Sequence, residues 1–134
     1  DTLTLAALTQ ALMRMLWRLS IRNQRWRLYD AFLVNENRWR AQRYGTAEGL
    51  IDLGRGEIVP MTELATEILE LVAEDAEFFS SLVEVGRIRD MVATGPSAER
   101  QRRTRAAASA AGADNDEALR AVVRHLIEEY HADL

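Results

Sequence analysis

Large apolar residues recur every three or four positions at the start of the chain, which is the period of one helix face. This stripe predicts an amphipathic helix over residues 3–20 and consists of Leu5, Leu8, Leu12, Leu16 and Leu19. Met13, Met15 and Trp17 widen the stripe. We therefore expect much of this helix to be buried.

A second helical pattern leads into a predicted β-hairpin. The pattern covers residues 28–44, and Gly45 is suited to cap that helix in a left-handed conformation. Two short apolar runs follow, at residues 49–53 and 57–59, on either side of a glycine-containing turn. Such a pair predicts a hairpin. Pro60 should end the second strand, because proline has no N–H to donate to the ladder.

An acidic row marks the next predicted helix, over residues 62–80. Its apolar face holds Leu64, Ile68, Leu71, Val72, Phe78 and Phe79, and its other face holds Glu63, Glu67, Glu70, Glu74 and Glu77. A row of glutamates could suggest a metal site. Without interleaved histidines or a second carboxylate element, a solvated helix face is the better interpretation.

Three more helices are predicted towards the end of the chain. One covers residues 82–93, with Val85, Ile88, Met91 and Val92 inward, and an alanine- and arginine-rich one over residues 98–111 should be exposed. Asp114 and Glu117 have the spacing of a capping box for the last helix. The apolar residues that form this helix are Leu119, Val122, Val123, Leu126, Ile127 and Tyr130. The pattern as a whole predicts a mainly α fold with one short β-hairpin.

Length and composition limit the number of domains and the location that we expect for this chain. With 134 residues, of which 48% are hydrophobic, we expect one domain or domain fragment over residues 1–134. No apolar run approaches the roughly 20 residues that cross a bilayer, and no signal peptide is visible, so we expect no membrane and a cytoplasmic location. The chain begins without methionine, which suggests a processed piece or an internal segment.

Residue usage excludes several kinds of chemistry. The chain has no cysteine, which rules out disulfides and thiolate chemistry, and all 17 of its Lys and Arg residues are arginine, which rules out a lysine nucleophile. A net charge of −4 argues against nucleic-acid binding. The arginines at residues 100–105 support RNA binding only weakly. The two histidines, His125 and His131, cannot build a triad or a metal site by themselves.

The candidate functional residues lie in one ten-residue stretch, Glu36 to Gly45. On a helix, Glu36, Arg40 and Arg43 share a face, so Glu36 can pair with Arg40. Arg43 then stands one turn further on, as the second cation of a possible anion clamp. Guanidinium groups match the oxygens of phosphate and carboxylate bidentately. On these residues alone, an exposed helix face with one weak salt bridge is the simpler interpretation.

A resemblance to a known family favours the anion clamp over the simple exposed helix face. The stretch ENRWRAQRYG, followed by LIDL, resembles the C-terminal region of the carboxylate-amine ligase family, the type 2 glutamate–cysteine ligase-like proteins. The later stretches VPMTELATEILELVAEDAE and SAERQRR resemble the family's following segments. The resemblance implies that the chain is the C-terminal helical portion of an α+β glutamine-synthetase-like fold. The family's N-terminal part, with its acidic metal ligands, has no counterpart here.

The resemblance also implies a reaction and a set of site residues. It implies an ATP-dependent ligase that joins a glutamate-type carboxylate to an amine with the help of Mg²⁺, whose ligands would lie outside this chain. Arg40 and Arg43 are the expected catalytic residues, and Asn37, Arg38, Trp39 and Tyr44 are expected to bind substrate or ATP. Asn37 would orient a phosphate or an arginine, and Trp39 and Tyr44 would fix the helix. Arg38 could instead face solvent.

This expectation requires partners. A companion chain or N-terminal segment would carry the rest of the active site, the small-molecule substrates would be a carboxylate and an amine, and an oligomer is expected. The alternative is a non-catalytic helical subunit or interaction module, because the leucine- and tryptophan-rich first helix could dock on a partner.

Overall fold

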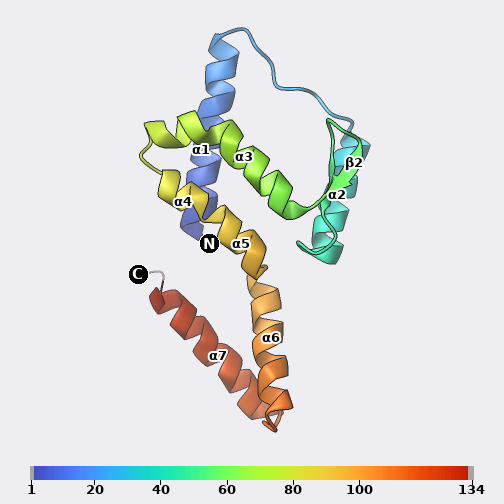
Figure 1. Cartoon of the computed structure of the whole chain (residues 1–134), viewed down its shortest axis with the longest axis vertical. Coiled ribbons are helices and arrows are strands. Elements are labelled where there is room, and N and C mark those ends of the chain that lie inside the picture. The colour runs from blue at the N-terminus through green and yellow to red at the C-terminus, as the bar shows by residue number, and fades with distance from the viewer. Residues whose placement is uncertain (1, 133–134) are drawn as a thin grey trace. The chain divides into compact units, whose positions relative to one another are not determined.

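A computed structural model describes residues 2–132. The chain divides into two compact units, residues 1–93 and 94–134, which we call unit 1 and unit 2. The described residues are mainly helical, with one two-stranded antiparallel sheet (Figure 1). The predicted class, mainly α with one short hairpin, is confirmed. A glutamine-synthetase-like parent fold and a single domain over the whole chain stay predictions.

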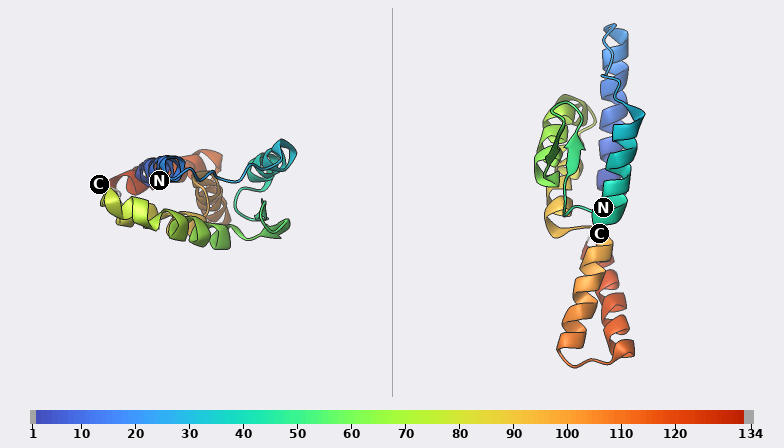
Figure 2. Two further views of the ribbon diagram at one scale, coloured as in Figure 1. Left: turned by 90° about the horizontal axis from the view of Figure 1, so that it is seen from above. Right: turned by 90° about the vertical axis from the view of Figure 1, so that its right-hand side faces the viewer.

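The core of unit 1 lies between its first helix and two later ones. Helix α1 (Thr2–Ile21) packs against α3 (Met61–Phe78) and α4 (Leu82–Gly86). Figure 2 shows α1 and α2 in one layer of unit 1 and α3 with α4 in the other. The buried cluster consists of Ala7, Leu8, Ala11, Met15, Val72, Ala76 and Val85. Three of these seven are alanines, which let the helix backbones approach closely.

The buried face of α1 is narrower than the leucine stripe predicts. Leu8 is buried, but Leu5 and Leu16 are exposed, and Met13 and Trp17 are more than three-fifths exposed. The expectation that much of this helix is buried is therefore wrong for unit 1. The physical reason is that α3 and α4 cover only one side of α1, and a helix contacting one layer buries only part of its surface.

Helix α2 (Ala31–Tyr44) begins three residues later than expected and leads into the hairpin. The carboxylate Oδ1 of Asp30 accepts a hydrogen bond from the Phe32 N–H at 2.7 Å and so caps the helix start. At the other end, Gly45 has φ +61° and ψ −124°. Its φ is positive as predicted, but its ψ lies outside the left-handed helical region.

The hairpin consists of β1 (Leu50–Asp52) and β2 (Glu57–Val59), paired antiparallel with Ile51 opposite Ile58. The predicted hairpin and its end at Pro60 are confirmed, and α3 starts directly afterwards. Gly49, just before β1, has φ +68°, and a Cβ there would lie 2.3 Å from the carbonyl oxygen of Val59. Only glycine fits this close approach of the two chain segments.

Helix α3 and the helical segment that follows it depart from the prediction in two places. On α3, Val72 is buried, whereas Leu71 and Phe78 are exposed instead of inward. The single helix expected over residues 82–93 is two helices, α4 and α5 (Ile88–Thr94). Gly86 is the last residue of α4, and glycine is among the weakest helix formers.

Unit 2 is a helical hairpin of α6 (Ser97–Ala110) and α7 (Asn115–Ala132). The predicted capping box is confirmed: the Glu117 N–H donates to Asp114 Oδ1 at 2.9 Å, and the Asp114 N–H donates to Glu117 Oε2 at 3.3 Å. No described residue of α6 is buried, as expected, and on α7 only Ala118 is. The large apolar residues Leu119, Val123, Leu126, Ile127 and Tyr130 of this helix are exposed.

No helix within residues 2–132 has the length and apolar character to cross a membrane.

Candidate functional site

Asn37 joins α2 to the first strand through both polar atoms of its side chain. Its Nδ2 donates to the Ile51 carbonyl oxygen at 2.7 Å, and its Oδ1 accepts from the Ile51 N–H at 2.7 Å. Ile51 is the central residue of β1. The carboxamide thus bonds to the strand as a neighbouring peptide group would, and it holds α2 against the hairpin.

Arg40 extends this connection one turn further along α2. Its Nη2 donates to the Glu48 carbonyl oxygen at 3.0 Å and its Nε to the Gly49 carbonyl oxygen at 3.3 Å. We call Asn37, Arg40 and the backbone at residues 48–51 the α2–β1 clamp. The predicted Glu36–Arg40 pair is wrong, since among the described residues Arg40 bonds carbonyl oxygens and no carboxylate.

The guanidinium of Arg40 is not saturated by these bonds. An arginine side chain has five N–H donors, and Arg40 uses Nε and one N–H of Nη2. Its Cζ also lies 5.7 Å from the ring centroid of Tyr44. Tyr44 in turn contacts Trp39 edge to face, with ring centroids 5.6 Å apart and an interplanar angle of 89°. The predicted role of the two aromatic residues in fixing this helix has a physical basis in these contacts.

Two arginines of the motif are free of the clamp. Arg38 and Arg43 are both exposed, and neither takes part in a hydrogen bond or ion pair within residues 2–132. The structure therefore holds Asn37 against β1 and Arg40 against the turn before it, with Tyr44 beside Arg40. Arg38 and Arg43 face outward. Of the two predicted catalytic arginines, one is held by the backbone and the other is open to a ligand.

A second arginine cluster, which the sequence analysis missed, joins α1 to α3. Asp75 is fully buried and accepts hydrogen bonds from Arg18, with Nη2 2.9 Å from Oδ2, and from Arg14 at Oδ1. Arg14 also lies over the ring of Phe78, 3.9 Å from its centroid. Burial raises the pKa of Asp75, but the hydrogen bonds from Arg18 and Arg14 lower it more, so the pKa lies below its usual value. We call Arg14, Arg18 and Asp75 the Asp75 cluster.

A signal for this cluster was present in the sequence. Asp75 follows Val72 by three residues and Ile68 by seven, so it lies on the apolar face of α3 and not in the glutamate row. A carboxylate on an apolar helix face requires a buried partner. The i, i+4 pair Arg14 and Arg18 on α1 supplies it.

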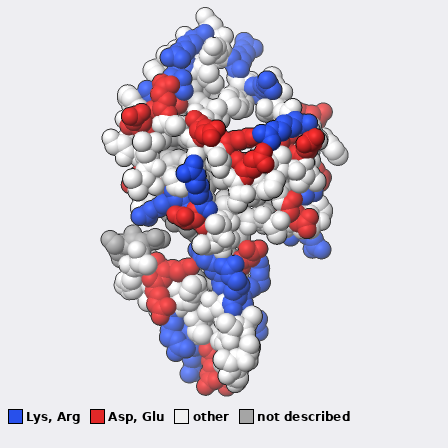
Figure 3. All heavy atoms as spheres, in the orientation of Figure 1, with Lys and Arg blue, Asp and Glu red and all other residues white. Residues whose placement is uncertain are grey.

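The glutamate row on α3 is partly used for ion pairs. Arg55, in the hairpin turn, bonds Glu63 Oε1 at 2.5 Å and also Glu67, and its Nε lies 3.2 Å from Asp52 Oδ2. The N–H groups of Gly54 and Arg55 hold the pKa of Asp52 below its usual value. Figure 3 shows acidic and basic side chains next to one another on the face that it presents. Arg55 thus ties the hairpin to α3.

No cluster of three potential His or carboxylate metal ligands occurs within residues 2–132. That the Mg²⁺ ligands lie outside this chain stays a prediction.

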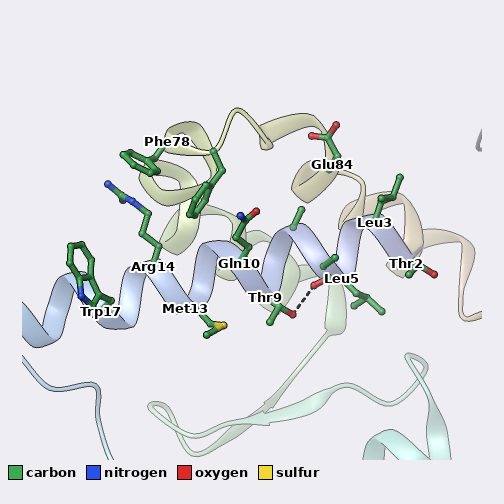
Figure 4. Close-up of a pocket in the computed structure, with 13 residues that line it drawn as sticks. Thr2, Leu3, Leu5, Thr9, Gln10, Met13, Arg14, Trp17, Phe78 and Glu84 are labelled. Carbon is green, nitrogen blue, oxygen red and sulfur yellow. Dashed lines mark hydrogen bonds between the residues drawn. The ribbon is translucent and has the colours of Figure 1, made fainter.

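A broad, mainly apolar depression lies between α1 and the segment that runs from the end of α3 into α4 (Figure 4). It has a volume of about 1320 Å³, and its lining includes Leu3, Met13 and Trp17 of α1 and Phe78 and Phe79 at the end of α3. Figure 4 shows Trp17, Arg14 and Phe78 towards one end and Leu3 and Glu84 towards the other. We call this depression the α1 groove. Its lining is mainly apolar, but it also includes the polar side chains of Thr2, Thr9, Gln10, Arg14 and Glu84.

Comparison with known proteins identifies the class to which this motif and fold belong. The model of glutamate-cysteine ligase family 2 matches residues 1–125. The chain belongs to this family, and the resemblance noted from the motif is confirmed.

Curated relatives match the chain over nearly its whole length. It is 59% identical over 132 residues to a Ruegeria pomeroyi protein and 54% identical over 134 residues to one from Jannaschia sp.. A Rhodospirillum rubrum protein is 52% identical over 134 residues, and all three carry the name "Putative glutamate--cysteine ligase 2". These matches cover 98–100% of this chain but only 34–35% of each relative. The chain thus spans about a third of the length of the relatives. No solved structure matches it significantly.

Proposed function

We propose that this chain is part of an ATP-dependent carboxylate–amine ligase of the glutamate–cysteine type, in which it supplies arginines that bind phosphate or carboxylate. Family membership is the observation that carries the proposal. The names of the relatives agree with it. Because the chain spans about a third of these relatives, the reaction belongs to a larger assembly that includes a companion chain or segment.

The reaction would need charge neutralisation more than covalent chemistry from this chain. An unactivated carboxylate does not react with an amine, so the γ-phosphoryl group of ATP would first be transferred to the glutamate side-chain carboxylate. The amine would then attack the acyl carbon, and inorganic phosphate would leave as the amide forms. Catalysis of phosphoryl transfer consists mainly of positioning and of neutralising negative charge.

Arg40 and Arg43 would share this work unequally. Two backbone carbonyl oxygens fix the guanidinium of Arg40, so its remaining donors have a defined direction. Such preorganised donors stabilise charge without rearranging during the reaction. Arg43 is exposed and unpaired within the described part of the chain, so it can close on a phosphate or carboxylate when the ligand arrives. Arg38 and Trp39 are neighbouring ligand-binding candidates.

Asn37 has a different role in this proposal. Both polar atoms of its side chain bond Ile51, so it acts as a positioning residue that sets where α2, and with it Arg40 and Arg43, stands against the hairpin. In this proposal, any Mg²⁺ takes its ligands from the companion.

The decisive experiment replaces Arg43 in a complete, active assembly that contains this chain. Arg43→Ala should lower kcat/KM by more than about tenfold, equivalent to at least ~1.4 kcal/mol of transition-state stabilisation. Gln42→Ala is the matched control, because Gln42 is an exposed neighbour on the same helix, and it should leave turnover within about twofold. A loss below tenfold for Arg43→Ala would remove this residue from the site.

The alternative is a non-catalytic helical subunit or interaction module, and the α1 groove favours it. Phosphate release from ATP in the presence of glutamate and amines, measured with and without the companion, separates the two functions. Release that depends on both the companion and the amine supports the ligase. A stable complex that never turns over supports the interaction module.

A further inference from the structure

We propose that the α1 groove is the surface on which the rest of a glutamate-cysteine ligase family polypeptide docks, that is, the two-thirds of the relatives' length that this chain does not match. The inference builds on the companion in the proposed function, and it names the surface that receives this companion. The groove borders the contact of α1 with α3 and α4, because Phe78, Phe79 and Glu84 line it together with exposed residues of α1.

The side chains along the groove are those of an interface rather than of a free surface. Leu3, Met13, Trp17 and Phe78 are 64%, 67%, 62% and 65% exposed and come together around one depression. Single exposed apolar residues are ordinary, but a contiguous group of this size marks an interaction site. Tryptophan, phenylalanine and methionine are also enriched in the centres of protein interfaces.

The positive charge of Arg14 in the groove is already neutralised, which narrows the chemistry of the occupant. Glu84 also lines the groove, and its carboxylate Oε2 is buried without a hydrogen-bond partner among the described residues. Arg14 lies in the groove, but its guanidinium binds the buried carboxylate of Asp75 and covers the ring of Phe78. Because the charge of Arg14 is already paired, the groove is not suited to bind an anion such as phosphate. An aliphatic or aromatic face of a protein segment, placed along Leu3, Met13 and Trp17, would suit it.

The lengths of the relatives point to the occupant. Relatives that are 52–59% identical to this chain continue for about two-thirds of their length outside the match. In those proteins the matching stretch is covalently joined to the remainder, which raises their mutual effective concentration to the order of millimolar. A second copy or an unrelated partner would have to displace a segment that is always present.

The test uses this chain with the unmatched remainder of the Ruegeria pomeroyi relative, co-expressed as two polypeptides with a tag on the remainder. We expect a complex that copurifies, and a photoreactive amino acid at position 13, in place of Met13, should crosslink to the remainder. Trp17→Asp should weaken the complex at least tenfold. Leu28→Asp is the control, because Leu28 is 97% exposed outside the groove, and it should change affinity less than threefold.

Several outcomes would overturn the proposal. They are no complex, a crosslink from position 13 to a second copy of this chain, or Trp17→Asp binding within threefold of the unchanged chain. Circular dichroism of the variant checks folding; if Trp17→Asp unfolds the chain, Trp17→Ala and the crosslink decide instead. A groove-dependent complex without ligase turnover keeps this docking surface and removes the proposed function. Ligase turnover that is unchanged by substitutions in the groove keeps the proposed function and removes this docking surface.

Discussion

Unit 1 contains two arginine arrangements that look alike in the sequence and differ in the structure. In the Asp75 cluster, Arg14 and Arg18 of α1 both bond one buried carboxylate. In the α2–β1 clamp, Arg40 bonds backbone carbonyl oxygens, and its neighbour Arg43 bonds nothing within the described residues. Both pairs lie on single helices at spacings that place their members on one face.

The difference shows that spacing predicts which arginines stand together but not what they bind. The acceptor, Asp75 on α3, lies 61 residues from Arg14 and 57 residues from Arg18 in the sequence. Arg40 finds its acceptors within nine residues, in the turn before β1. A pair with a buried acceptor stabilises the fold, whereas an arginine without an acceptor is available to a ligand. Four measurements would sharpen or break this contrast.

The largest effect is expected at Asp75. Asp75→Asn removes the charge that two arginines share in the core, and breaking a buried ion pair typically costs about 3 kcal/mol. Urea unfolding should report a loss of this size. Glu74→Gln is the matched control, since the Glu74 side chain is 61% exposed although it lies 3.2 Å from Arg18; it should cost less than about 0.5 kcal/mol. Equal effects of the two variants would refute the assignment of Asp75 as the central acceptor.

The next effect is local to the α2–β1 clamp. Asn37→Ala removes two hydrogen bonds to Ile51, each worth about 1 kcal/mol. The backbone N–H of Ile51 should then exchange with solvent faster by about tenfold or more, because its acceptor is gone. Asn35→Ala, an exposed position on the same helix, is the control. Unchanged protection at Ile51 in the Asn37 variant would mean that the hairpin holds this strand without α2.

A smaller effect separates the two arginines of the motif. Arg40→Ala should destabilise the chain by about 1 kcal/mol through its lost bonds to two carbonyl oxygens. Arg43→Ala should change stability by less than about 0.5 kcal/mol, as surface substitutions usually do. Thermal or urea unfolding of both variants tests this. If Arg43→Ala were the more destabilising, Arg43 would have a structural partner and could not be the open donor.

The smallest effect concerns pH. The pKa of Asp75 is lower in the folded chain than its usual value near 3.9. The unfolded chain therefore takes up this proton first as pH falls, so the stability that Asp75 contributes is present at neutral pH and is lost below about pH 4. Unfolding free energy measured between pH 7 and pH 3 should fall more steeply for the unchanged chain than for Asp75→Asn. Parallel curves would show that Asp75 does not titrate as described.

Local pattern was sufficient for most of the elements, although the helix expected over residues 82–93 is two helices. The helices at both ends, the hairpin, its end at Pro60 and the Asp114–Glu117 capping box are all confirmed, because each depends on residues close in sequence. The family could be predicted from the stretch Glu36 to Gly45. Burial could not be predicted in the same way. Leu5, Leu16 and Trp17 belong to a helical stripe, but α3 and α4 cover only another part of that helix.

The sequence by itself determined the helices, the hairpin and the family, since helix periodicity, turn residues and motif spacing are local properties of a chain. Only the tertiary structure decided that Asp75 binds Arg14 and Arg18, that Arg40 is held while Arg43 stays open, and that an apolar groove remains along α1. The reason is that hydrogen-bond acceptors and burial come from segments distant in sequence, whose positions follow from packing and not from the order of residues.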